Sequence, residues 1–84
     1  MLSYKLMNVE WRQRIECKPG VLCGKPVVRG TRLSVEFLLG LLAGAWEFSQ
    51  ILEAYPGLTR EDLLACLDYA RELVATERIV PVSR

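Results

Sequence analysis

The three cysteines are the side chains in this 84-residue sequence best suited to nucleophilic or metal chemistry, and the sequence contains no histidine. Cys17, Cys23 and Cys66 are an odd number and form no C-x-x-C pair, which argues against a disulfide framework and favours a reducing, cytoplasmic setting. A cysteine nucleophile usually needs a histidine as its activator, and zinc sites use histidine or clustered thiols. We therefore expect neither a metal nor another cofactor.

Carboxylates that lie close together could serve general acid–base catalysis, and two such pairs occur. Glu61 and Asp62 are adjacent, and Asp68 and Glu72 are spaced i, i+4. These positions are typical of a helix start and of a solvated helix face. With no histidine as a base, the sequence predicts a protein that is not an enzyme and has no small-molecule substrate.

The segment from Gly24 to Arg32 reads G-K-P-V-V-R-G-T-R and brings cations to a turn. Gly30 permits a tight backbone turn, and the hydroxyl of Thr31 can bond the local backbone. The segment is not a phosphate-binding P-loop, because its lysine follows the first glycine rather than the last.

Two interpretations of the arginines in this turn stay open. Guanidinium groups can clamp a phosphate or a partner's carboxylate. Alternatively, one arginine could hold the β-region to the helices through helix carbonyl groups or an acidic side chain such as Asp62 or Asp68. We expect Arg32 to have the structural role and Arg29 the binding role.

Charge is divided unevenly along the chain. Residues 1–34 carry seven basic and two acidic side chains, a net charge of +5, whereas residues 35–84 carry four basic and eight acidic ones, a net charge of −4. An anionic partner would therefore bind the N-terminal part. The alternative is that these charges pair with the acidic helices.

Hydrophobic periodicity and capping residues predict a mostly α domain, a three-helix bundle with a short N-terminal β-region. Strands are expected over 11–16 and 26–28, with Pro26 confining the second to an edge. Ser34 caps a helix over 35–43, and Gly44 ends it as a C′ residue. A second helix spans 47–54, and Thr59 caps a third that frays near 76–78. We divide the chain into an arm (1–10), the domain (11–78) and a tail (79–84).

These residues resemble the family named domain of unknown function 433. The match covers residues 12–76 and rests on ordered motifs: Gly24-Lys25-Pro26, Gly30-Thr31-Arg32, Ile51-Leu52, Tyr55-Pro56 and Leu58-Thr59. The resemblance implies a homeodomain-like helix-turn-helix fold and a dimer. It also implies an antitoxin encoded beside a PIN-like ribonuclease toxin, which binds its own promoter as well. One departure is Ala45, where the family usually has the glycine preceding Trp46.

Apolar composition also points to a partner. Hydrophobic residues make up 51% of this short chain, more than its thin core can be expected to bury. No apolar run approaches the ~20 residues that span a membrane, and the start of the sequence lacks a secretory signal. Trp11 is suited to stacking or to docking on a partner, and Trp46 to the core or a dimer contact. The expected dimer or partner interface comprises Trp11, Trp46, Ile79 and Val80.

The predicted function is that of a cytoplasmic antitoxin that binds a PIN-like toxin, with a DNA-binding dimeric regulator as the alternative. The third helix opens Arg60-Glu61-Asp62, and its carboxylates would repel phosphates in the major groove. The basic N-terminal part is therefore the better surface for DNA. The candidate residues for DNA or partner binding are Arg12, Arg14, Lys25, Arg29, Thr31, Arg32 and Arg60.

Overall fold

A computed structural model describes residues 10–76. Within this range the chain is mostly α, with three α-helices and a two-stranded antiparallel sheet, as the sequence predicts. The expected arm except for Glu10, the expected tail with Ile79 and Val80, and positions 77 and 78, where the third helix is expected to fray, lie outside the described residues. The elements in chain order are η1 (Trp11–Gln13), β1 (Ile15–Cys17), η2 (Leu22–Gly24), β2 (Pro26–Val28), α2 (Val35–Ala43), α3 (Phe48–Ala54) and α4 (Arg60–Thr76).

The predicted strand over 11–16 is wrong in its first part. Residues Trp11–Gln13 form the 3₁₀-helix η1, and β1 begins only at Ile15. The carboxylate of Glu10 accepts from the backbone N–H of Arg12, which supports this helical turn. β1 then pairs with β2 in the register Ile15↔Val28 and Cys17↔Pro26.

Helix α2 begins at the predicted cap, because the backbone N–H of Phe37 donates to Ser34 Oγ at 2.9 Å. The helix ends at Ala43, as predicted, but its C′ residue lies one position later than predicted. Gly44 has φ −85°, and Ala45 takes the left-handed conformation with φ 74°. The helical bonds extend to Gly44, so the C′ position falls on Ala45, and the N–H of Trp46 reaches back to Leu41 O at 3.0 Å.

Helix α4 begins with the predicted capping box. Asp62 Oδ2 accepts from the N–H of Thr59 at 2.9 Å, and Thr59 Oγ1 accepts from the N–H of Asp62 at 3.2 Å. Aspartate is one methylene shorter than the usual glutamate, yet it closes the same pair of bonds.

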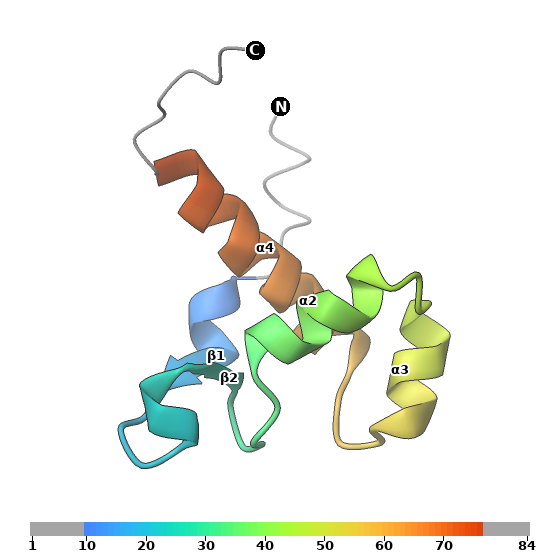
Figure 1. Cartoon of the computed structure of the whole chain (residues 1–84), viewed down its shortest axis with the longest axis horizontal. Coiled ribbons are helices and arrows are strands. Elements are labelled where there is room, and N and C mark those ends of the chain that lie inside the picture. The colour runs from blue at the N-terminus through green and yellow to red at the C-terminus, as the bar shows by residue number, and fades with distance from the viewer. Residues whose placement is uncertain (1–9, 77–84) are drawn as a thin grey trace.

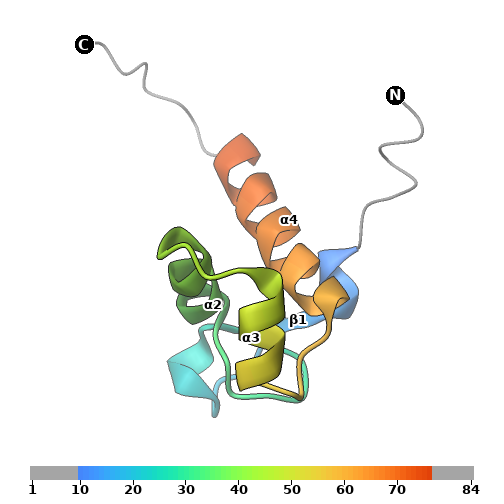
Figure 2. The ribbon, with the colours of Figure 1, turned by 90° about the vertical axis from the view of Figure 1, so that its right-hand side faces the viewer.

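The core lies where α2, α3, the sheet and the first half of α4 meet, and the second half of α4 extends beyond it (Figures 1 and 2). Leu63 and Cys66 are fully buried, whereas Leu73 and Val74 are 54% and 64% exposed. No helix in the described range is long and apolar enough to cross a membrane. The buried core residues are Ile15, Val28, Val35, Leu38, Ile51, Leu58, Leu63, Ala65 and Cys66.

Candidate partner-binding surface

The cations predicted to bind an anionic partner are mostly paired with carboxylates of the same chain. Arg12 contacts Glu10 at 2.7 Å and Glu72 at 2.9 Å. The hydrogen bonds that Arg12 donates to Glu10, first, and to Glu72 raise the pKa of its guanidinium. The described part of the +5 segment is thus largely neutralised, as the second interpretation of the charge division expects.

Arg14 joins the β-region to α4. Its Nη1 lies 3.1 Å from Asp62 Oδ1, and the Asp62 side chain is largely buried, at 10% exposure. The single carboxylate of Asp62 therefore closes the capping box and holds this arginine. Because Asp62 points inward, the exposed first turn of α4 presents Arg60 and Glu61 to solvent.

Arg29, which the sequence predicts to bind a partner, makes hydrogen bonds that hold the β-region together. Its guanidinium donates to the carbonyl oxygens of Gln13 (3.1 Å) and Arg12 (3.3 Å) and to Glu16 Oε1 (3.1 Å). Backbone acceptors cannot be recognised from side-chain types, which explains why the sequence favoured the other arginine for this role.

The turn that follows β2 places Arg32 on the surface. Gly30 has φ 83°, and Thr31 Oγ1 donates to Val28 O at 2.8 Å while accepting from the N–H of Leu33. Arg32 is exposed and makes no hydrogen bond or ion pair within residues 10–76. The expected structural role of Arg32 is therefore not what the structure shows.

Trp11 lies against its own α4. Its Nε1 donates to Glu72 Oε1 at 3.0 Å, its ring meets Tyr69 edge-on at 4.7 Å, and Arg12 lies 4.6 Å above the ring. This indole is a contact within one chain rather than a free stacking platform. Sequence reasoning missed Tyr69 and Glu72 as its partners, although their i, i+3 spacing places them on one helix face.

The outer face of α2 is the opposite case, because its large side chains stay uncovered. Phe37 is 41% exposed and Trp46 is 40% exposed. The ring of Phe37 meets Tyr55 edge-on at 5.8 Å, which fixes one side of Phe37 and leaves the other open. We call this surface the α2 strip; it comprises Phe37, Gly40 and Leu41 of α2, the cap residue Gly44, and Trp46, whose ring lies close to Gly44 beyond the end of the helix.

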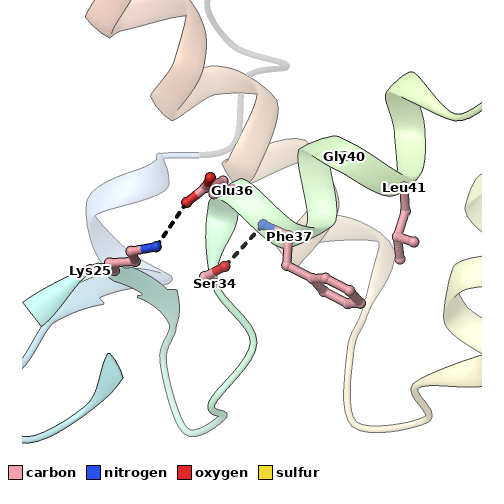
Figure 3. Close-up of a pocket in the computed structure, with 6 residues that line it drawn as sticks. All are labelled: Lys25, Ser34, Glu36, Phe37, Gly40 and Leu41. Carbon is pink, nitrogen blue, oxygen red and sulfur yellow. Dashed lines mark hydrogen bonds and ion pairs between the residues drawn. The ribbon is translucent and has the colours of Figure 1, made fainter. Parts of the chain in front are cut away.

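An open depression of about 450 Å³ lies along the α2 strip (Figure 3). Lys25 and Glu36, which are among its lining residues, form an exposed ion pair of 3.1 Å, and the side chains of Phe37 and Leu41 point away from this pair. The lining residues are Lys25, Ser34, Glu36, Phe37, Gly40 and Leu41.

Gly40 is not required by the fold. It lies inside α2 with ordinary helical geometry, and a Cβ atom there would meet nothing within 4 Å. Glycine inside a helix costs about 1 kcal/mol relative to alanine. Sequence reasoning missed Gly40 and Phe37 as candidate binding residues. One signal could have found them: Glu36 is the sole charged residue of this helix. A helix that is apolar on all sides is usually covered by other parts of the protein or by a partner.

The cysteines do not form a reactive centre in the described part of the chain. Cys17 and Cys23 are exposed, and Cys66 is buried. Burial, with a smaller contribution from Asp62, raises the pKa of the Cys66 thiol to about 12, so this thiol stays protonated. No group of three or more potential metal ligands occurs among the described residues.

Comparisons with known proteins identify the family. Residues 15–70 match the family model described as Protein of unknown function (DUF433). The uncharacterised protein y4eO of Sinorhizobium fredii is 36% identical over 59 residues, 70% of this chain but 27% of that protein, so the chain spans about a quarter of its length. A crystal structure of a DUF433 member from Anabaena variabilis superposes with a TM-score of 0.68 at 31% identity, covering 88% of this chain and 68% of that one. The chain therefore belongs to the DUF433 family.

Proposed function

We propose that this chain is a non-catalytic, antitoxin-type module that binds and neutralises a PIN-like ribonuclease toxin in the cytoplasm. The proposed unit is a homodimer with a homeodomain-like fold, in which α3 and α4 form the helix-turn-helix. The toxin class comes from the family resemblance in the sequence. The binding of a protein partner is supported by the exposed apolar side chains of the α2 strip.

The observation that carries the proposal is the exposed, nearly uncharged α2 strip. Phe37 and Trp46 are each about 40% exposed, and a Cβ atom at Gly40 would meet nothing within 4 Å, so a partner helix or loop could approach the backbone of Gly40 closely. Aromatic side chains dominate the energetics of protein interfaces. The Lys25–Glu36 pair at the edge is exposed, so it can stay solvated when the strip is covered.

Co-expression tests the proposal. A PIN-like toxin encoded beside this chain is expressed alone and together with it, and growth and co-purification are measured. We expect growth arrest with the toxin alone, restored growth with both proteins, and a stable complex. Growth that is not restored, together with no complex, would refute the proposal.

DNA binding is a second candidate, favoured by one observation. Arg32 and Arg60 are exposed cations without a carboxylate partner in the described range, and Arg60 lies 5.9 Å from the ring of Phe48. A mobility-shift titration with the promoter tests this candidate. Binding should weaken as salt rises and should fall in Arg32→Ala; binding that ignores both would exclude this surface.

A further inference from the structure

We propose that the projecting half of α4 pairs with α4 of a second copy of this chain, antiparallel and about a two-fold axis near residues 70–71. The proposal deepens the proposed function and rests only on its homodimer. We call the surface the α4 stripe; it comprises Leu67, Ala70, Leu73 and Val74.

The α4 stripe continues the pattern of the core beyond the point where the core ends. Leu63 and Cys66 are fully buried by the rest of the chain. One and two turns later Leu67, Leu73 and Val74 are 41%, 54% and 64% exposed. Figures 1 and 2 both show these last turns extending away from α2 and α3. The helix is amphipathic over its whole length, but the described residues leave the α4 stripe largely uncovered, while η1 covers the side that bears Tyr69 and Glu72.

Charges near the α4 stripe would not oppose burial. Asp68 and Arg71 pair with each other on the same helix at 2.8 Å, and Glu72 is held by Trp11 and Arg12 on the side toward η1. At 100° per residue Asp68 and Glu72 lie off the stripe, whereas Arg71 lies at its edge, next to Leu67 and Val74. Covering the stripe would therefore leave no buried carboxylate without its partner.

The order of side-chain sizes favours a second copy over a different partner. Leu67, Ala70 and Val74 read large, small, large over about 10 Å of helix. An antiparallel copy places Leu67 against Val74 at both ends and the two Ala70 residues near the axis, where small side chains allow close approach. A two-fold interface requires this self-complementarity, in which residue i meets j and j meets i.

The size of the α4 stripe predicts a weak contact. A standard stable interface buries about 800 Å² on each partner, and four side chains on two turns provide less. We expect monomers at about 1 µM and dimers toward about 1 mM, as for small, transient interfaces.

Sedimentation equilibrium of the full chain over that concentration range tests the pairing. The mass should rise from that of one chain toward that of two. Val74→Glu should raise the concentration of half-dimerisation at least tenfold, whereas Ala75→Glu, the adjacent exposed position off the stripe, should leave it unchanged. Far-ultraviolet circular dichroism confirms that both variants fold. A wild-type chain that stays monomeric, or two variants with equal effects, would overturn the proposal without bearing on toxin binding.

Cross-linking tests the antiparallel register in a Cys17→Ser, Cys23→Ser background. Ala70→Cys should form a disulfide-linked dimer on mild oxidation. Val74→Cys should cross-link to Leu67→Cys in a mixture, and poorly to itself. Efficient self-cross-linking of Val74→Cys with none for Ala70→Cys would indicate a different arrangement and overturn the proposal.

Discussion

Two regions of the molecule differ in whether their prominent side chains find partners within the chain. One is the junction between the β-region and α4, and the other is the α2 strip. At the junction, Arg14 and Trp11 find their partners Asp62 and Glu72 within the same chain. On the α2 strip, aromatic carbon stays in contact with solvent. The comparison teaches that a conspicuous cation in the sequence can be structural, while the surface left for a partner can consist of residues without chemical reactivity.

The largest effect is expected from Asp62→Ala, which removes the capping bond from the Thr59 N–H to Asp62 Oδ2 and the Arg14 ion pair. We expect the free energy of unfolding to fall by about 3 kcal/mol, because a cap and a charged hydrogen bond are lost together. Urea denaturation measures it. Asp68→Ala is the matched control on the same helix and should cost less than about 0.5 kcal/mol. Equal losses would show that the junction does not have the special role assigned to it.

Trp11→Phe tests the hydrogen bond between Trp11 and Glu72 at the junction separately from the packing of the ring. The ring stays aromatic but cannot donate to Glu72, and we expect a loss of about 1 kcal/mol in the free energy of unfolding. Trp46→Phe on the α2 strip should change stability by less, because Trp46 has no hydrogen-bond partner for its indole among the described residues. The reverse order would contradict the division between the two regions.

Gly40→Ala tests whether the fold requires the glycine of the α2 strip. Because nothing lies near the added methyl group, the free energy of unfolding should rise by up to about 1 kcal/mol. Thermal and urea unfolding measure the change. A destabilised variant would show that the fold itself needs this glycine, and the argument for a partner at the α2 strip would lose its support.

The smallest effect concerns the end of α2. Ala45 has φ 74°, and Ala45→Gly should raise the free energy of unfolding by about 0.5–1 kcal/mol by relieving the left-handed conformation. Ala43→Gly, two residues earlier inside the helix, should lower it by a similar amount. If both substitutions changed stability in the same direction, the assignment of Ala45 as the C′ residue would be wrong.

Local signals in the sequence predicted local structure well. The caps at Ser34 and at Thr59 with Asp62 were predictable, because each depends on residues three positions apart. The C′ residue was misplaced by one position, since both Gly44 and Ala45 lie at the end of the apolar pattern. Helix ends are set by competing hydrogen bonds that composition does not resolve.

Contacts between distant residues could not be predicted in the same way. Trp11 was assigned to a strand, and its partner Glu72 lies 61 positions away in the sequence. Counting charges gave the division into basic and acidic parts but not their pairing, so the contacts of Arg29 with the β-region and the exposure of Arg32 were not predicted. Of the α2 strip, Trp46 was predicted as an interface residue, but Gly40 and Phe37 were missed, because glycine and phenylalanine in a helix carry no motif of their own.

The measurement that tests the central claim most directly is the affinity of the PIN-like toxin for two glutamine variants of α2. Gly40→Gln places a long side chain on the α2 strip, while Ala43→Gln places the same side chain at an exposed position of the same helix off the strip. By isothermal titration calorimetry, we predict a Kd raised at least tenfold by Gly40→Gln, equivalent to about 1.4 kcal/mol, and a Kd unchanged by Ala43→Gln. Equal affinities for both variants and the wild-type chain would contradict the assignment of the α2 strip as the partner-binding surface.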